Sequence, residues 1–408
     1  GEHRLHGSTR RGALATRGQL TVRAPPAGPL ADRTVLVANP AADLYGSDRM
    51  MLEAIKGLLA QGARVVATCS QTGPLVDRLE ELGVDVRITE VPIIRKSVLS
   101  PRGMLRLAGT VASALPRMRR LIGDVGADIV IANTLTLPFW SLAARSCRRP
   151  VIVYVHEAES SLSRAARTLL TAPLALAHGV VFNSETSRAV CTSRTLERRG
   201  RVRVVLNGVA GPPAMRPPRD RIEGPARLLF IGRLSPRKGP DLLIDAASLL
   251  RSMGVEATAD LVGDVFPGYE WYEDQLRARV RELGLEEKVR FRGFRSPVWD
   301  EIGDADLMIV PSRGDESFGN VVIESLLSAR PVIVADHTGL REAASGFAGA
   351  VRVVPGDAEA IAEAARDMLR DWDGSREAAV ADAVTARTRL GTERFHGEFV
   401  RAVVELDR

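Results

Sequence analysis

Two glutamates, Glu316 and Glu324, lie on either side of a Ser-Phe-Gly-Asn turn in the stretch DESFGNVVIESLL. Gly319 permits a tight turn, and the N–H groups of residues 318–320 are placed to bind an anion where the next helix begins. Glu324 would repel a phosphate, but its carboxylate can accept hydrogen bonds from the hydroxyls of a ribose. Glu316 is expected to reach a polar group deeper in the site. The stretch therefore predicts a nucleotide-binding site, whereas a lone glutamate would more often cap a helix or face solvent.

A second loop supplies positive charge. The segment GRLSPRKG follows the apolar run LLFI and contains Arg233 and Lys238. Two cations beside a helix N-terminus, which carries partial positive charge, can clamp a diphosphate. The glycine spacing differs from that of a Walker loop. Taken alone, the loop is equally compatible with a solvated segment.

Other loops after predicted strands also hold polar residues. In YGSD, Gly46 permits close approach of a ligand, and Ser47 is suited to cap the next helix. His156 comes directly after the run VIVYV, a position that favours a cleft over a hydrophobic core. Asp304 and Asp306 form an Asp-x-Asp pair, but they precede a strand and so lie at the opposite edge of the sheet. We therefore predict no metal site.

The composition is typical of a soluble enzyme. Of 408 residues, 45% are hydrophobic and 26% charged, and three scattered cysteines are too few for a disulfide framework or a zinc site. We find no run of about 18 apolar residues and no signal-peptide pattern, and we expect a cytoplasmic protein. Residues 1–220 contain 31 Lys and Arg against 17 Asp and Glu, so this half is expected to face an anionic partner.

From Thr34 onward, short apolar runs alternate with segments of helical period, as in βαβ units. This pattern predicts an α/β fold with two Rossmann-like, doubly wound domains that face a cleft. The predicted parts are a flexible basic extension (1–33), an N-terminal domain (34–209), a proline-rich linker (210–225), a C-terminal domain (226–385) and a C-terminal helix (386–408). This helix could pack on either domain, and packing back on the N-terminal domain is the candidate arrangement.

In their order along the chain, FIGRLSPRKG, VGD, VRFRG and PSRGDESFGNVVIESLLSARPVI resemble motifs of the family-four retaining glycosyltransferases, whose fold is called GT-B. The segments VIVYVHE, VFNSETSR and VLNGV resemble the N-terminal half of that family, so the resemblance spans about residues 34–400. It implies a metal-independent enzyme that moves a sugar, with retention at the anomeric carbon, from a UDP- or GDP-sugar to a hydroxyl acceptor. It implies no cofactor beyond this co-substrate and no nucleic-acid partner.

The resemblance also implies a role for each matching residue. Arg233 and Lys238 match the pair that binds the donor diphosphate, and Glu324 matches the glutamate that holds the ribose. Glu316 and His156 match residues beside the donor sugar, and Phe294 lies in the loop that meets the base. The implied catalytic residues are Glu316, His156, Arg233 and Lys238. The implied donor-binding residues are Gly46, Ser47, Arg233, Lys238, Phe294, Glu316, Ser317, Phe318, Gly319, Asn320 and Glu324.

Three positions depart from the family pattern. Ala329 and Thr338 stand where the family has glycine, and YGSD replaces a pair of glycines in the first loop. The nucleotide site is expected to be intact despite these changes. The resemblance does not extend to the transferred sugar or the acceptor pocket.

A basic segment of the N-terminal domain is the candidate contact for the acceptor. Residues 93–123 place seven cations among Leu, Val and Met, which is typical of one or two amphipathic helices on an anionic bilayer. The cations are Arg95, Lys96, Arg102, Arg106, Arg117, Arg119 and Arg120. A solvated helix face explains the pattern equally well. We expect a lipid-linked or anionic acceptor, with peripheral attachment to the inner face of the membrane.

Two alternatives stay open from the sequence. One is another enzyme of this architecture, an epimerase or a phosphorylase. A pyridoxal-type phosphorylase needs a cofactor lysine, and the C-terminal domain has only Lys238 and Lys288. The other is a catalytically inert subunit that binds a nucleotide sugar. Binding of nucleotide diphosphates, followed by assays of sugar release, separates these alternatives.

Overall fold

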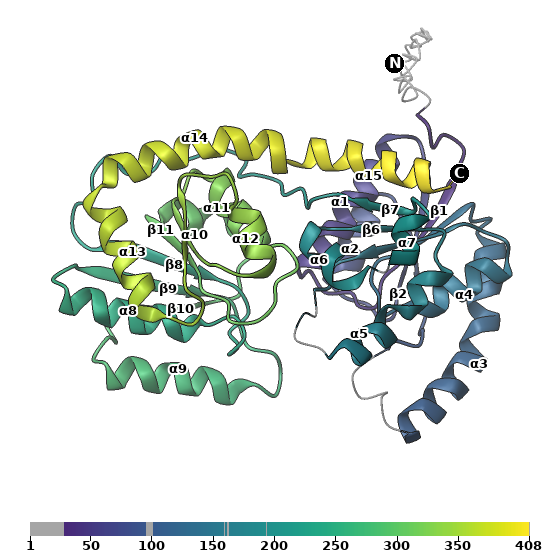
Figure 1. Cartoon of the computed structure of the whole chain (residues 1–408), viewed down its shortest axis with the longest axis horizontal. Helices are drawn as coiled ribbons and strands as arrows, with labels where there is room; N and C mark the ends of the chain where they lie inside the picture. Colours follow the sequence, from purple (N-terminus) through teal and green to yellow (C-terminus); the bar gives the residue numbers. More distant parts are fainter. Residues whose placement is uncertain (1–27, 95–100, 159, 161–162, 193, 408) are drawn as a thin grey trace, which may run out of the picture.

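The computed structural model describes residues 28–94, 101–158, 160, 163–192 and 194–407. The chain forms two α/β domains that lie side by side, each built around a parallel sheet (Figure 1). The N-terminal sheet has seven strands and the C-terminal sheet has six. The predicted fold class is confirmed.

The N-terminal sheet has the strand order β3-β2-β1-β4-β5-β6-β7. Its strands are β1 (Thr34–Ala38), β2 (Arg64–Cys69), β3 (Asp85–Ile88), β4 (Ile129–Ala132), β5 (Val151–Val155), β6 (Gly179–Phe182) and β7 (Val202–Val204). Its helices are α1 (Gly46–Ala60), α2 (Pro74–Glu81), α3 (Pro101–Asp124), α4 (Pro138–Ser146), α5 (Arg164–Thr171), the 3₁₀ helix η2 (Ala172–Leu176), α6 (Glu185–Cys191) and α7 (Arg194–Arg198). The strand order reverses between β1 and β4, and a crevice is expected at such a point.

The C-terminal sheet has the strand order β10-β9-β8-β11-β12-β13, with the reversal between β8 and β11. Its strands are β8 (Ala226–Ile231), β9 (Ala257–Val262), β10 (Val289–Gly293), β11 (Leu307–Val310), β12 (Val332–Ala335) and β13 (Ala350–Val353). Its helices are α8 (Pro240–Ser252), α9 (Glu270–Glu282), α10 (Trp299–Asp304), α11 (Asn320–Leu327), α12 (Thr338–Ala344) and α13 (Ala358–Arg370).

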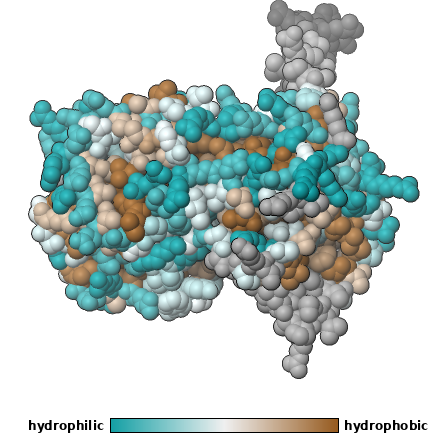
Figure 2. All heavy atoms as spheres, viewed as in Figure 1, coloured by the Kyte–Doolittle hydropathy of each residue, from teal (hydrophilic) through white to brown (hydrophobic). Residues whose placement is uncertain are grey.

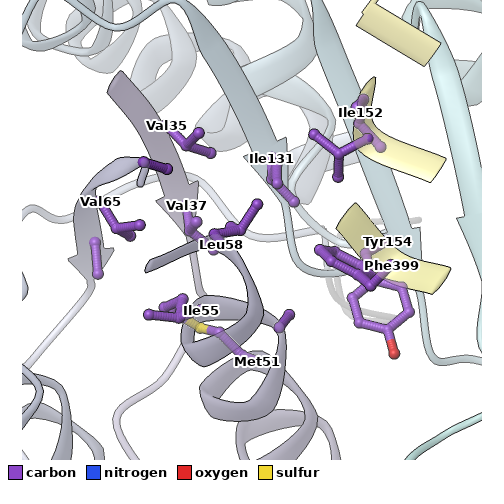
Figure 3. Packing of buried hydrophobic residues seen from close by; sticks show 14 of the residues in the cluster. Val35, Val37, Met51, Ile55, Leu58, Val65, Ile131, Ile152, Tyr154 and Phe399 are labelled. Atoms are coloured by element: carbon purple, nitrogen blue, oxygen red, sulfur yellow. The ribbon is translucent and has the colours of Figure 1, made fainter. Parts of the chain in front are cut away.

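The central strands are buried on both faces, which explains why they are apolar throughout. Consecutive side chains of a strand point to opposite faces of the sheet. In β1, Val35 and Val37 join a cluster with Met51 of α1, and Figure 3 shows side chains of β1 and of α1 that belong to this cluster. Leu36, between them, joins a different cluster on the other face with residues of α3 and α4.

Two long helices end the chain and connect the domains. Helix α14 (Trp372–Leu390) extends from the C-terminal domain to the N-terminal domain, where α15 (Thr392–Asp407) covers one face of the first sheet (Figure 1). Phe395 and Phe399 of α15 are fully buried there. The helix that packs on the N-terminal domain thus begins at Thr392, whereas we expected a single helix from residue 386. Gly391, which is extended, separates α14 from α15.

The start of the N-terminal domain also differs from the prediction. Leu30 is buried in the core, and Arg33 forms an ion pair with Asp407 of α15, with 2.8 Å between Nη2 and Oδ2. Residues 28–33 therefore belong to the folded domain and not to a flexible extension. Residues 1–27 lie outside the described part of the chain.

The basic segment of the N-terminal domain contains one long helix, α3, whose N-terminal end extends away from the domain (Figure 1) and whose C-terminal half packs in the core. Arg95 and Lys96 precede it and lie outside the described residues, as do the side chains of Arg102 and Arg106. Among the described residues, no helix combines the length and hydrophobicity that crossing a bilayer requires.

Candidate active site between the two domains

A cavity of about 730 Å³ lies between the two sheets, at the carboxyl ends of their strands. Its walls include the loops that follow β1, β4, β5 and β6 in one domain and β8, β9 and β11 in the other. The first cavity-lining residues of these loops are Asn39, Asn133, His156, Asn183, Gly232, Gly263 and Ser312. Polar residues from both domains thus surround one space, as is typical of ligand sites in open α/β sheets.

Glu316 lies among cations. Its Oε1 is 2.7 Å from Lys238 Nζ and 3.1 Å from Arg237 Nη1, and Arg237 also donates to the carbonyl oxygen of Asp315. Burial alone would raise the pKa of Glu316, but the charges of Lys238 and Arg237 outweigh it and hold the pKa below its usual value. Glu316 is therefore an ionised carboxylate that holds the lysine in place.

Glu324 lies in a different environment. It is 4% exposed, and its Oε1 accepts a hydrogen bond of 3.0 Å from Arg49 Nη1 of helix α1, in the other domain. Burial raises the pKa of Glu324, and the charge of Arg49 opposes this only in part. The arginine comes from a position 275 residues away in the chain.

Arg233 lies between two aromatic rings. Its guanidinium carbon is 3.3 Å from the ring centroid of Phe266 and 4.7 Å from that of Tyr45, which belongs to the N-terminal domain. Burial lowers the pKa of Arg233, but an arginine remains charged at neutral pH. Cation–π contacts on both sides hold the guanidinium at the edge of the cavity.

The turn before α11 is supported by the start of α12. The N–H of Gly339 donates to the carbonyl oxygen of Glu316 at 2.9 Å, and a Cβ at this glycine would lie 2.4 Å from the carbonyl carbon of Ser317. The hydroxyl of Thr338 accepts a hydrogen bond from the N–H of Glu316 at 3.1 Å. The first N–H groups of α11 have no partner within the helix, so they can bind an anion.

Thr338 and Ala329, the two departures from the family's glycines, both have left-handed backbone conformations, with φ of 41° and 53°. Such conformations favour glycine. At Thr338 the hydroxyl offsets this cost, because it satisfies the N–H of Glu316. No contact in the structure explains the alanine at position 329.

His156 lies opposite the C-terminal loops and is neutral. Burial lowers its pKa to about 3. Its ring packs against Tyr154 with 4.0 Å between ring centroids, and its Nε2 is 3.2 Å from Asn133 Oδ1. Figure 3 shows that Tyr154 in turn lies against Phe399 of α15. The terminal helix therefore supports one wall of the cavity.

Two family models match the chain, one over each domain. Residues 45–210 match the family described as Glycosyltransferase Family 4, and residues 213–384 match the one described as Glycosyl transferases group 1. The chain belongs to glycosyltransferase family four. Its two facing domains are those of the GT-B fold.

Curated relatives are glycosyltransferases, and solved structures share the fold of the chain. The D-inositol 3-phosphate glycosyltransferase of Jonesia denitrificans is 35% identical over 185 residues, which are 40% of this family-four chain and 43% of that relative. The chain thus spans less than half the length of this curated relative. HepE of Anabaena in complex with UDP-glucose has a TM-score of 0.75 at 20% identity, over 91% of this chain and 99% of HepE. A glycosyltransferase of Rickettsia africae has a TM-score of 0.75 at 18% identity, over 92% and 98% of the two chains.

The structure of this family-four chain brings the candidate residues from the sequence together. Those that line the cavity are Gly46, Ser47, His156, Arg233, Lys238, Phe294, Glu316, Ser317, Gly319, Asn320 and Glu324. Phe318 differs, because its side chain is buried in the core of the C-terminal domain and only its backbone is left to meet a ligand. The roles of these residues toward a donor stay predictions.

Several cavity residues escaped the sequence analysis. Arg237 is next to Lys238 in the same basic loop. The presence of three cations in this loop could have predicted that Arg237 also lines the cavity. Arg49 and Tyr45 lie beside Gly46 and Ser47, but nothing in their local sequence indicates contacts with the other domain. Asn39 and Asn133 come directly after β1 and β4, and this position at the ends of strands was the available signal for both.

The Asp-x-Asp pair has structural partners. Asp306 is buried, forms an ion pair with Arg219, and accepts a hydrogen bond of 2.7 Å from the N–H of Arg227. Asp304 pairs with Arg216 at 3.1 Å. Both acidic residues lie before β11, at the opposite edge of the sheet from the cavity.

Proposed function

We propose that this chain transfers a sugar from a UDP- or GDP-sugar to a hydroxyl acceptor, with retention at the anomeric carbon and without a metal ion. The observation that carries the proposal is the arrangement of charge in the cavity. Arg233, Arg237 and Lys238 lie on one side, together with the N-terminus of α11, and Glu324 lies buried on the same wall. Cations and helix N–H groups suit a diphosphate, and a buried carboxylate suits a ribose.

The same arrangement supports a mechanism. When the bond between the anomeric carbon and the diphosphate breaks, negative charge grows on the leaving phosphate. Fixed cations at that position stabilise the transition state more than the ground state. Glu316 is suited to hold Lys238 for this role, since their charged atoms are 2.7 Å apart. The leaving phosphate is the base that we assign to the acceptor hydroxyl, because it lies on the same face of the sugar.

A thermal-shift screen of UDP, GDP, ADP and their sugars tests the donor site. A ligand at about 100 times its Kd adds roughly 2.7 kcal/mol to the stability of the folded state, so a true donor should raise Tm by a few degrees. Release of free sugar from the stabilising donor, with and without candidate acceptors, then tests transfer. If no nucleotide diphosphate raises Tm, the donor site is wrong; if one binds but its sugar is never released, the chain is a binding subunit.

We further propose that the acceptor is presented at an anionic membrane surface. In the described part of α3, Arg117, Arg119 and Arg120 are exposed. Leu169 of α5 is 61% exposed, and Figure 2 shows hydrophobic surface on the N-terminal domain in the lower right of the view. Exposed arginines and exposed apolar side chains on one domain are suited to the headgroups and acyl boundary of an anionic bilayer.

Co-sedimentation with vesicles tests this attachment. Vesicles with anionic lipid should retain the protein, and purely zwitterionic vesicles should not. Reversing the three α3 arginines to glutamate should abolish retention, whereas reversing three exposed arginines of the C-terminal domain, Arg281, Arg370 and Arg387, should have little effect. Equal retention by both kinds of vesicle would contradict the proposal.

A further inference from the structure

Helix α1 of the N-terminal domain brings one arginine into the cavity. Arg49 lies in the first turn of α1 and lines the cavity. Its Nη1 is 3.0 Å from Oε1 of Glu324, which lies in α11 of the C-terminal domain and lines the same cavity. An ion pair between the two domains therefore lies inside the cavity itself.

The carboxylate of Glu324 depends on Arg49. Among the described residues, no other group forms a hydrogen bond or an ion pair with this carboxylate. The Glu324 side chain is 5% exposed, so water compensates its charge little, and an ionised carboxylate buried without a partner is costly. The Arg49 side chain is 36% exposed and can move into water. The cost of separating the pair thus falls mainly on Glu324.

Glu316, the other glutamate of the turn, is held differently. Its partners Arg237 and Lys238 belong to the same domain as Glu316 itself. Movement of the two domains apart leaves these pairs intact, but it carries Arg49 away from Glu324 because α1 moves with the N-terminal domain. Of the two glutamates, Glu324 is thus the one whose charge loses its partner when the cleft opens.

Arg49 also fills the place that a ligand of Glu324 needs. A ribose binds a carboxylate through two neighbouring hydroxyls, which need room beside its oxygens. The guanidinium of Arg49 is bonded to Oε1 of Glu324, and the glutamate side chain has almost no accessible surface left. A pair of hydroxyls and Arg49 therefore compete for the same carboxylate.

We propose that Arg49 occupies the ribose subsite of the empty protein, so that a nucleotide binds there only by displacing Arg49 from Glu324. The inference rests on the proposed function, because it takes Glu324 as the residue that holds the ribose. The ribose hydroxyls replace the arginine as donors to the buried carboxylate, which keeps Glu324 satisfied after the ion pair has broken. Arg49 thus competes with the donor and joins the two domains while the cavity is empty.

The contribution of the ribose hydroxyls to affinity tests this competition. The parent is titrated calorimetrically with UDP or GDP and with the dideoxy form of the same nucleotide, which lacks both ribose hydroxyls. The ratio of the two Kd values measures what the hydroxyls contribute, and any contact of Arg49 with the diphosphate cancels because both ligands carry it. In the parent the hydroxyls must displace a charged donor, so Arg49→Leu should raise this ratio about tenfold.

Three further variants show whether the effect belongs to the ion pair. Arg49→Gln also removes the charge, so it should raise the ratio too, and it provides the measurement if Arg49→Leu does not fold. Arg78→Leu removes an exposed arginine of α2 in the same domain and should leave the ratio at the parent value. In Glu324→Gln, the added Arg49→Leu change should affect the ratio much less, since the charged acceptor is gone.

The outcomes separate this inference from the proposed function. If neither UDP nor GDP binds the parent, the proposed function has failed and this inference fails with it. If the nucleotide binds, but Arg49→Leu and Arg49→Gln leave the ratio unchanged or lower it, Arg49 does not compete with the ribose. This inference has then failed, while the proposed function stands. An equal rise of the ratio in Arg78→Leu would also overturn the inference.

Discussion

Glu316 and Glu324 lie eight positions apart in the sequence, yet their surroundings differ in charge. Glu316 contacts two cations, which keep its pKa below the usual value although burial opposes this. Glu324 is buried with one arginine, and burial raises its pKa. The first is thus suited to organise charge around a phosphate. The second is an acceptor whose ionised form is costly in the empty protein.

We predict a large loss of turnover for Lys238→Met. The change removes a positive charge beside the leaving phosphate, and by analogy with other transition-state donors the loss should be about 10²–10³-fold in kcat. It also removes one of the two cations at Glu316, so the pKa of Glu316 should rise. If kcat falls at low pH because Glu316 becomes protonated, that fall should therefore occur at a higher pH in the variant. The control is Lys288→Met, which removes a surface lysine of the same domain. Equal kcat in the two variants would contradict the assigned role.

We predict that Glu324→Gln stabilises the empty protein at pH 7.5 but weakens nucleotide binding. The pKa of Glu324 is higher in the folded state than in the unfolded state. Its contribution to the free energy of unfolding is therefore fully present only at a pH below the unfolded-state pKa, and it is lost as the pH rises through the folded-state pKa. The uncharged glutamine avoids that loss, so its advantage in Tm should shrink as the pH falls toward 5. Arg49 keeps contact with water, since its side chain is 36% exposed.

The binding half of this prediction follows from the lost charged acceptor. Hydrogen bonds to charged groups contribute about 1.5–3 kcal/mol, so the Kd of the nucleotide should rise about 10- to 100-fold. Glu377→Gln, at an exposed position of α14, is the matched control for both measurements. A lower Tm at pH 7.5 would show that the contact with Arg49 outweighs burial, and an unchanged Kd would contradict the ribose assignment.

At the scale of elements, the start of α12 shapes the turn before α11. Gly339 permits the close approach, and the hydroxyl of Thr338 satisfies the N–H of Glu316. His337 extends this contact, because its Nδ1 lies 2.9 Å from the Thr338 hydroxyl and its Nε2 lies 2.6 Å from the carbonyl oxygen of Ser312. The segment between β12 and α12 is thereby tied at two points to the loop between β11 and α11, which forms the predicted phosphate site.

We predict that Thr338→Val costs about 1–3 kcal/mol of unfolding free energy, because it leaves the N–H of Glu316 without a partner. Thr338→Ser keeps the hydroxyl and should stay close to the parent. Urea unfolding of the two variants measures the difference. Because valine keeps the size and branching of threonine, the comparison isolates the hydroxyl. Equal stability of the valine and serine variants would show that this hydrogen bond contributes nothing.

At the scale of the whole molecule, polar contacts join the two domains around the cavity. Asn207 Nδ2 donates to Asn320 Oδ1 at 2.7 Å, and Ser184 donates to the carbonyl oxygen of Ser317 at 2.5 Å. Glu342 of α12 accepts hydrogen bonds from the N–H groups of Glu185 and Thr186 at the start of α6, each at 2.9 Å. These contacts tie the loops after β6 and β7 to α11 and α12, so separation of the two domains would break them.

We predict that Glu342→Ala opens the empty protein. The change removes the acceptor for the N–H groups that begin α6 and for the hydroxyl of Thr186, so the closed arrangement loses about 1–3 kcal/mol. The radius of gyration from small-angle scattering should increase relative to the parent, and a saturating donor should restore it. Glu377→Ala is the control, since that side chain is exposed on α14. Identical scattering of parent and variant would argue against this role of Glu342.

The sequence predicted most of the fold because the relevant signals are local. Apolar runs such as Ile129–Ala132 are buried on both faces, and the turn at Gly319 comes directly before a helix, so short segments already contain the pattern. The fold class and the loops that line the cavity were therefore predictable. The start of the N-terminal domain was not, because Leu30 and Arg33 are fixed by contacts with distant parts of the chain.

By itself, the sequence determined two parallel sheets, a phosphate-type turn and a basic loop, since each depends on residues within one segment. Only the tertiary structure decided which side chains meet across the cavity. Arg49 reaches Glu324, Tyr45 stacks on Arg233, and Asn133 contacts His156. These contacts join residues that are far apart in the chain and, for the first two pairs, in different domains. Their geometry follows from how the domains and the returning helix α15 pack, and packing leaves no periodic signal in the sequence.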